Sequence, residues 1–342
     1  MGNKHCGRQT VRFASPPVVQ GYGSAAGRKE ADGPLGGCFD FTGTDDTFGE
    51  KSWEKAETFL QRQALAFALK RAGRTARELD YLFAGDLLNQ CIATSYAVRG
   101  QPVPFFGLYG ACSTMAEGLS LAAMLLDGGF AEHIAALTSS HFCSAERQYR
   151  NPLEYGGQKP PTAQWTATGS GAVVLGRTGR GPRITHVTTG RVIDKGITDA
   201  NDMGAAMAPA AYATLQAHFD DTGRGPEDYD RIVTGDLGSL GRAIVADFFR
   251  RDGIDMGTRY DDCGVLLYDA KGQDVHAGGS GCGCSAIVLA GRLLRDLEDG
   301  TLRSLLFCGT GALHSPTATM QGESIPGICH AVAFVAGEGA EV

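Results

Sequence analysis

Apolar positions along the chain form two kinds of pattern. Short apolar runs predict β-strands, and apolar spacings of three and four residues predict amphipathic helices. One helix is bounded by Ser52, a good N-cap, and by Gly73, a good C-cap, while others begin at Cys112 and Ser285 or pass through Met207. The predicted strands cover residues 9–20, 81–85, 104–109, 134–138, 172–175, 231–235, 304–308 and 331–334. Strands that alternate with helices in this way favour a mainly parallel sheet covered by helices.

The order of these elements is duplicated along the chain. Residues 80–87, Asp-Tyr-Leu-Phe-Ala-Gly-Asp-Leu, match residues 230–237, Asp-Arg-Ile-Val-Thr-Gly-Asp-Leu, at an offset of 150 (230 minus 80). Residues 125–129 are echoed by residues 297–301 at an offset of 172 (297 minus 125). The helices that carry this second echo begin at Cys112 in the first half and near Cys284 in the second.

We therefore expect two similar halves, residues 1–180 and residues 181–342, each with the order strand-helix-strand-helix-strand. The first half carries Cys112 and a loop-rich insertion at residues 141–168. The glycine- and aspartate-rich residues 21–50 show no period, and we expect them to be irregular.

Composition narrows the class of protein. The 342 residues are 43% hydrophobic and 20% charged, as in an ordinary soluble globular protein. A net charge of −7 without a basic cluster argues against a nucleic-acid partner. No apolar run reaches the roughly 18 residues of a membrane span, so we expect any membrane association to be peripheral. The ten cysteines include no Cys-x-x-Cys pair, and we expect free thiols, no metal site and no cofactor.

A cysteine opens the predicted helix of the first half. In Gly110-Ala-Cys112-Ser-Thr114 the thiol would lie at the first helical turn, where backbone N–H groups and the helix dipole lower a thiol pKa. Cys112 is therefore a candidate nucleophile. The alternative is a small buried thiol that fills space at a crowded turn.

The segment from Gly110 to Leu119 resembles the nucleophile elbow of the ketoacyl synthases and thiolases. The resemblance implies a thiolase-like α/β fold, in which duplicated βαβαβ halves form five layers, αβαβα. In those enzymes two second-half residues, His with His or His with Asn, activate the cysteine and hold the oxyanion. Here the matching positions hold Gly235 and Ser280, and removing such partners costs roughly three to six orders of magnitude in rate. The resemblance therefore implies a non-catalytic homologue.

Longer motifs carry a narrower resemblance. These are Gly33-Pro-Leu-Gly36, Ser52-Trp-Glu-Lys-Ala-Glu57, Gly85-Asp-Leu-Leu-Asn-Gln90, the whole of residues 138–168, Gly278-Gly-Ser-Gly281 and Gln321-Gly-Glu-Ser-Ile-Pro326. With them the chain resembles the stage V sporulation protein AD family, thiolase-fold subunits of the spore channel for dipicolinic acid. The resemblance spans about residues 8 to 335.

This resemblance implies a ligand, partners and a location. The ligand is dipicolinate (pyridine-2,6-dicarboxylate), free or as its calcium chelate, taken up when the forespore is loaded. The partners are membrane-embedded SpoVA subunits and, as is usual for thiolase folds, a second copy of the chain. The location is the periphery of the forespore or spore inner membrane, and otherwise the cytoplasm.

A flat ring with two carboxylates requires cations or N–H donors and apolar or aromatic walls. The insertion supplies such groups, and the alternative is a salt-bridge network with Glu146 and Glu154. The candidate ligand-binding residues of the insertion are His141, Arg147, Arg150, Lys159 and Trp165, with Tyr149 and Tyr155 interleaved.

The elbow offers a second set of donors. Backbone N–H groups near Cys112, in the 278–283 turn and in a turn at 309–311 are expected to converge on the ancestral acyl site, with Ser280 in place of a base. His314 follows the last of these turns and is the candidate titratable contact. Histidines 141, 276 and 314 could in principle replace the missing base, although a lone histidine near a glycine loop is more often structural.

Two aspartates, Asp86 and Asp236, occupy equivalent positions after paired strands, and we interpret them as helix or turn caps. Calcium coordination lacks a carboxylate cluster with ligand spacing. Two other functions stay open: a residual acyltransferase that uses Cys112, and a purely structural channel subunit.

Overall fold

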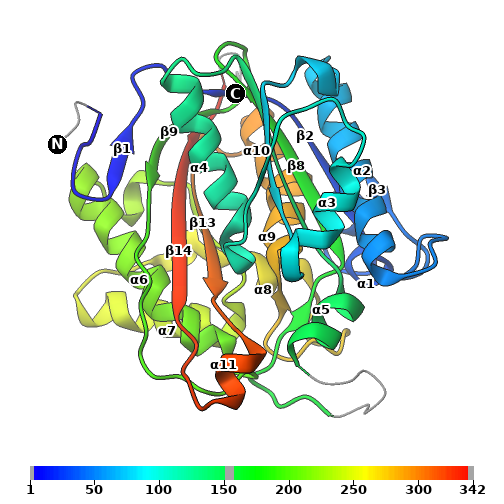
Figure 1. The fold of residues 1–342 in the computed structure, drawn as a ribbon. Coiled ribbons are helices and arrows are strands. Elements are labelled where there is room, and N and C mark those ends of the chain that lie inside the picture. The colour runs from blue at the N-terminus through cyan, green and yellow to red at the C-terminus, as the bar shows by residue number, and fades with distance from the viewer. Residues whose placement is uncertain (1–3, 151–157, 338–342) are drawn as a thin grey trace.

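Ten strands form the centre of the protein. The computed structural model describes residues 4–150 and 158–337, and within them the strands lie in the order β11-β10-β13-β14-β9-β2-β8-β6-β4-β5. Figure 1 shows β14 between β9 and β13, and β8 beside β2. The first half contributes β2 (Val18–Ala26), β4 (Tyr81–Gly85), β5 (Phe105–Gly107), β6 (His133–Ser140) and β8 (Gly169–Gly176). The second half contributes β9 (Arg183–Thr188), β10 (Arg231–Thr234), β11 (Tyr260–Asp262), β13 (Ser304–Ala312) and β14 (Gly327–Val335).

The two halves repeat one topology. When the five strands of each half are numbered along the chain, both halves have the order 3-2-4-5-1. Strand 4 pairs with strand 5 antiparallel, and strand 2 pairs with both of its neighbours in parallel. The ladder between β2 and β9 is a single pair, Val18 with Arg183, so the halves form two sheet layers. The predicted duplication is confirmed, but the expectation of a mainly parallel sheet is wrong, because five of the nine ladders along this order are antiparallel.

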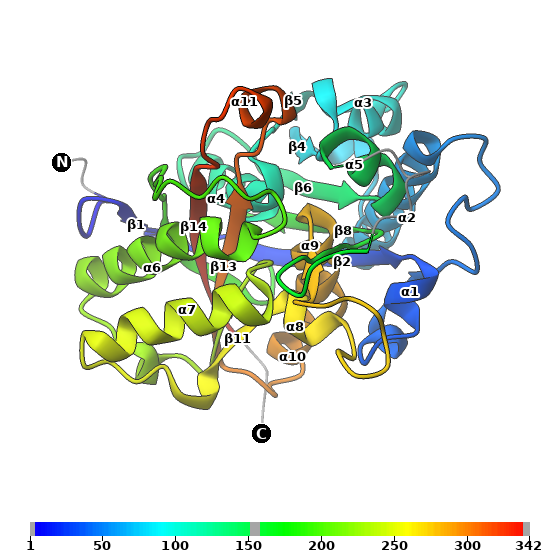
Figure 2. The ribbon, with the colours of Figure 1, turned by 90° about the horizontal axis from the view of Figure 1, so that it is seen from below.

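Three apolar cores separate the layers. The central helices α4 (Thr114–Asp127) and α9 (Cys282–Val288) pack between the sheets, and α4 contacts strands of both halves. Helix α2 (Trp53–Ala72) covers the first sheet, and α6 (Met203–Thr222) with α7 (Gly238–Arg251) covers the second. Figure 2 shows α6 and α7 on one side of the molecule and α2 on the other.

Shorter elements connect these layers. They are α1 (Arg28–Ala31), α3 (Ile92–Val98), α5 (Phe142–Tyr149), α8 (Cys263–Leu267), α10 (Leu294–Glu298), α11 (Pro316–Met320), the 3₁₀ turn η4 (Ala111–Ser113) and the π-helical turn η8 (Leu289–Leu293). Strands β1 (Thr10–Arg12) and β3 (Phe41–Thr42) lie off the main path, and β7 (Trp165–Thr166) pairs with β12 (Gly279–Ser280). Among the described helices, none combines the length and apolar character needed to cross a bilayer.

The local predictions hold where a cap or a long apolar face defines an element. The Ser52 side chain accepts the backbone N–H of Lys55 at the start of α2, and Gly73 ends that helix in the left-handed region. The predicted single strand at 9–20 is wrong, because Pro16 and Pro17 lack the N–H groups of a ladder. Strand β2 instead begins at Val18 and runs to Ala26, into the stretch we expected to be irregular.

Candidate functional site

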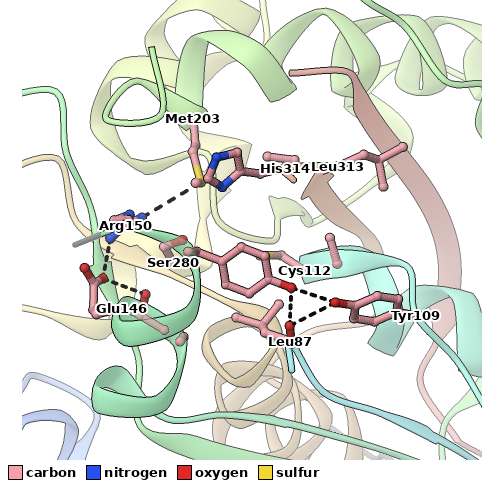
Figure 3. A pocket seen from close by; sticks show the side chains of 14 residues that line it. Leu87, Tyr109, Cys112, Glu146, Arg150, Met203, Ser280, Leu313 and His314 are labelled. Carbon is pink, nitrogen blue, oxygen red and sulfur yellow. Dashed lines mark hydrogen bonds and ion pairs between the residues drawn. The ribbon is translucent and has the colours of Figure 1, made fainter. Parts of the chain in front are cut away.

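A pocket of about 240 Å³ opens beside Cys112, between segments of both halves (Figure 3). The elbow, helix α5, the end of β13 and the first turn of α6 all contribute to it. Its lining residues are Leu87, Tyr109, Ala111, Cys112, Ala145, Glu146, Tyr149, Arg150, Thr166, Met203, Ser280, Ala312, Leu313 and His314. Four of the predicted ligand-binding residues therefore share one cavity: Cys112, Arg150, Ser280 and His314.

The elbow is a strained turn. Ala111 has a φ of 52°, in the left-handed region that costs a non-glycine residue free energy. At Gly110 a Cβ would lie 2.2 Å from Oε2 of Glu117, so a larger residue there would have to displace that flexible side chain. Gly309 of β13 lets the elbow helix approach, since a Cβ there would lie 2.6 Å from the Cβ of Ala116. The turn directs Cys112 toward the pocket with 6% of the residue exposed.

The Cys112 thiol is not activated. Burial raises its pKa well above the usual value, and the nearby Asp236 carboxylate raises the pKa further. Our expectation of a helix-lowered thiol pKa is therefore wrong, because desolvation and a negative neighbour outweigh the helix N-terminus. Within residues 4–150 and 158–337, no histidine is hydrogen-bonded to this sulfur.

The two partner positions of the enzymes hold no base. Gly235 follows β10 directly, and a Cβ there would lie 3.0 Å from the backbone nitrogen of Thr310. Ser280 is 3% exposed and its hydroxyl is hydrogen-bonded to the carboxylate of Asp236. The Asp236 carboxyl group, and not an imidazole, lies next to the Cys112 thiol.

Asp236 does not act as the cap that we predicted. It accepts hydrogen bonds from the Gly281 amide (2.9 Å) and from Thr310 Oγ1 (2.7 Å), and so it ties two second-half segments together beneath the thiol. Burial raises the pKa of Asp236 to about 6. The N-terminus of α7 is held by another residue, Asp262, which accepts the Leu237 amide at 2.8 Å.

Asp86, the equivalent of Asp236 in the first half, does act as the predicted cap. It accepts the Leu88 amide at 2.8 Å, and Thr94 donates to it through the amide at 2.8 Å and through Oγ1 at 2.6 Å. Two positions that match in the sequence therefore have different roles in the structure.

Positive charge gathers at one wall of the pocket. The Arg150 and Glu146 side chains, only 8% and 6% exposed, form an ion pair. The same Glu146 oxygen also binds Lys159 Nζ at 3.2 Å and accepts from Thr166 Oγ1 at 3.1 Å. One carboxylate thus faces two cations. Among the described residues, the acceptor for the NH2 group of Arg150 is the weak acceptor Met203 Sδ, at 3.8 Å.

Aromatic and apolar groups form the other walls. The Tyr149 ring lies 5.7 Å from the ring of His314, and its hydroxyl is 2.8 Å from the hydroxyl of Tyr109. Met203 and Leu313 complete the wall near His314 (Figure 3). Sequence reasoning missed Tyr109, Met203 and Leu313 as site residues, because nothing local marks an apolar residue that later folds against a cavity.

Four predicted site residues lie outside the lining. Arg147 is half exposed, pairs with Glu54 and lies 5.1 Å over the Trp53 ring. His141 is buried as the N-cap of α5, where its Nδ1 accepts the Cys143 amide at 3.2 Å. These contacts support the structural interpretation of both side chains.

The remaining two, Lys159 and Trp165, lie outside the pocket lining and contact each other, with Lys159 Nζ 5.3 Å from the Trp165 ring centroid. The Trp165 ring also packs on Phe142 at 3.8 Å, and Lys29 Nζ lies 3.6 Å from its centroid. Lys159 influences the pocket through its bond to Glu146. Glu154 and Tyr155 lie outside the described residues.

The expected convergence of backbone N–H groups is wrong for residues 309–311. These residues belong to β13, and their register against β14 leaves no turn there. In the 278–283 segment the Gly281 amide is engaged by Asp236, and the Gly283 amide binds Ser140 Oγ at 3.1 Å. These two amides are therefore not available to an anion in the pocket.

No group of three or more potential metal ligands occurs among the described residues. The geometry thus offers a small, half-apolar pocket with a buried arginine, a serine, a histidine and a protonated thiol. Such a set can bind an anion, and the pKa of its thiol is raised, whereas a thiol nucleophile is usually activated by an adjacent base or a lowered pKa.

Known proteins resemble this chain at two levels. The family described as stage V sporulation protein AD matches residues 7–335. Stage V sporulation protein AD of Bacillus subtilis (strain 168) is 49% identical over 337 residues, which cover 98% of this chain and 99% of that protein.

Solved structures share the fold at low identity. The 3-oxoacyl-[acyl-carrier-protein] synthase III of Aquifex aeolicus VF5 is 13% identical with a TM-score of 0.55, over 93% of this chain and 99% of that one. Cerulenin-bound OleA of Xanthomonas campestris is 17% identical with a TM-score of 0.61, over 95% and 97%. These matches establish the predicted thiolase-like fold.

Proposed function

The chain belongs to the stage V sporulation protein AD family, and on that premise we propose that it binds dipicolinate, free or chelated to calcium, in the Cys112 pocket. We propose further that it is a peripheral subunit of the spore channel that loads dipicolinate during sporulation. In this role the pocket is a former acyl-binding site that keeps its position beside Cys112 and no longer has the catalytic partners of the cysteine.

The charge beside the pocket carries the proposal. Among the residues that the structure describes, Arg150 and Lys159 share a single carboxylate, that of Glu146, so the pair of cations carries one positive charge more than their described partner neutralises. A buried cation without full compensation is costly unless an anion joins it. A carboxylate on the NH2 group of Arg150 would supply that anion through a charge-assisted hydrogen bond.

The remaining walls suit a flat ring. A cavity of about 240 Å³ is small for a drug-sized ligand and fits a single ring with short substituents. Tyr149, Met203 and Leu313 offer the apolar surface, while the His314 ring, whose Nδ1 has no partner among the described residues, offers a polar contact to the carboxylate that Arg150 holds.

The acyltransferase alternative is disfavoured by the state of Cys112. Its pKa is raised by burial and by Asp236, so the thiolate that attacks a thioester is scarce at neutral pH. Incubation with acyl-CoA thioesters followed by mass spectrometry separates the two functions. An acylated Cys112 peptide would favour the enzyme.

Isothermal titration with dipicolinate, with and without calcium, tests the proposal directly. Cys112→Ala and Ser280→His change the floor of the pocket and should weaken binding, whereas Cys6→Ala alters an exposed thiol and should not. Unchanged affinity in both pocket variants would place the ligand elsewhere. No measurable affinity in any form would leave a structural channel subunit.

The homodimer, the membrane-embedded partners and the location at the spore inner membrane are also part of this proposal, and family membership supports them. Sedimentation analysis of the purified chain and co-purification with the membrane subunits test them independently of ligand binding.

A further inference from the structure

His314 has an unused hydrogen-bonding atom at the pocket. Its Nδ1 is buried, and it has no hydrogen-bond partner among the described residues. The ring lines the pocket just after β13 and packs against Tyr149. A buried polar atom without a partner costs free energy, and a ligand that supplies the partner recovers it.

Among the described residues, no carboxylate is free to pair with His314. From α5 and its end it meets the Tyr149 ring and the charge of Arg150, and from the elbow the pocket adds Tyr109 and Cys112. The carboxylate of Glu146 is taken up by Arg150, Lys159 and Thr166. The second carboxylate, Asp236, is occupied by Gly281 and Thr310. In Figure 3 the Met203 sulfur lies between Arg150 and His314.

We propose that His314 takes up a proton when an anion is seated between its ring and Arg150, so that capture of the ligand also brings a proton into the pocket. This inference rests on the proposed function and adds the protonation state of His314 in the complex with the ligand. The bound carboxylate would accept a hydrogen bond from each side, one from Arg150 and one from the protonated imidazole.

The electrostatics support this coupling. Without ligand, burial lowers the pKa of His314, and the Arg150 charge lowers the pKa further, so the ring is neutral at neutral pH. An anion within about 4–6 Å raises a histidine pKa by about 1–3 units. The free ligand is fully ionised at this pH, because carboxyl groups titrate roughly three units lower. The proton must then come from the solvent.

The expected signature is a proton count. Titration of calcium-free dipicolinate into the full chain at pH 6.5, in phosphate and in imidazole buffer, should give heats that differ by the ionisation enthalpies of the buffers. The difference should correspond to about half a proton or more per ligand. Affinity should fall as pH rises above neutrality, by up to about tenfold per unit.

Two variants locate the proton. His314→Gln keeps a hydrogen-bond donor and cannot become charged, so it should bind more weakly with heats that no longer depend on the buffer. His133→Gln, on β6 and hydrogen-bonded to Gln20, should behave as the unaltered chain. Should the His314 variant misfold, the imidazole proton resonances of the unaltered chain give the same answer, because ligand must shift one of them toward the charged form.

The outcomes are distinguishable. Binding with equal heats in both buffers, or proton uptake that persists in His314→Gln, overturns this inference and leaves the proposed function intact. Absence of binding in every buffer removes both.

Discussion

Glu146 and Arg150 are expected to affect stability in the same direction and ligand affinity in opposite directions. Both side chains are almost fully buried and form one ion pair, so removing either destabilises the fold. In the proposed complex, however, Glu146 competes with the ligand for Arg150. Removing the competitor should therefore strengthen binding, and removing the cation should weaken it.

The magnitudes follow from the partners that remain. After Arg150→Met, Glu146 keeps Lys159 at 3.2 Å and Thr166 at 3.1 Å, so the free energy of unfolding should fall by only about 1–3 kcal/mol. After Glu146→Gln, the buried Arg150 loses its carboxylate, and the loss should approach the roughly 3–5 kcal/mol of a broken buried pair.

Affinity separates the two variants. Arg150→Met removes a charge-assisted contact of about 1.5–3 kcal/mol, which corresponds to roughly 10- to 150-fold weaker dipicolinate binding. Glu146→Gln removes a negative charge next to the ligand carboxylate and should tighten binding several-fold at low ionic strength.

Urea denaturation and isothermal titration of the same preparations measure both effects. Arg147→Met is the matched control, since its ion pair with Glu54 is half exposed. It should change the unfolding free energy by less than about 1 kcal/mol and leave affinity unaltered. If Glu146→Gln weakens binding as much as Arg150→Met, the reasoning from competing charges is refuted.

Three further predictions concern the thiol, a buried acid and the packing of the elbow. At pH 7 iodoacetamide should modify the exposed Cys6 well before Cys112, whose pKa is raised by burial, and early modification of Cys112 by peptide mass spectrometry would contradict this. Burial raises the pKa of Glu30 from 4.5 to about 7, so its contribution to the free energy of unfolding is fully present below pH 4.5 and is lost as pH rises through about 7. That loss amounts to up to about 3 kcal/mol (7 minus 4.5, times about 1.36), and Glu30→Gln should remove it. Urea denaturation between pH 5 and pH 8 measures the difference, and a pH profile that is the same with and without Glu30 would disprove the assignment. Gly309→Ala places a methyl group 2.6 Å from a neighbouring Cβ and should cost about 1–3 kcal/mol, whereas Gly37→Ala, with nothing within 4 Å, should be nearly neutral in thermal denaturation.

Local signals in the sequence were sufficient for most elements of the fold. Ser52 and Gly73 fix the ends of α2 because a cap acts on backbone groups within one turn. The similar segments at 80–87 and 230–237 indicated the duplication, since the same pattern of apolar residues followed by Gly-Asp-Leu forms the same strand in each half. Motifs spread over the whole chain were sufficient to predict the family.

The same local reasoning failed where one sequence pattern is compatible with two different structures. Gly309 and Gly311 read as a turn, yet they lie in β13 because the elbow needs room against that strand. Asp86 and Asp236 occupy matching positions, but only Asp86 is a cap. Glycine and aspartate serve turns, caps and close contacts alike, so only their neighbours in space distinguish these uses.

The sequence by itself determined the fold, the position of the elbow cysteine and the absence of histidine and asparagine at the two partner positions. Tertiary structure alone decided the state of the thiol, the choice of Arg150 over Arg147 as the buried cation, and the place of Met203 in the wall. The physical reason is distance along the chain. Burial, charge pairing and cavity walls arise between residues that are tens to hundreds of positions apart, and a pKa depends on all of them together.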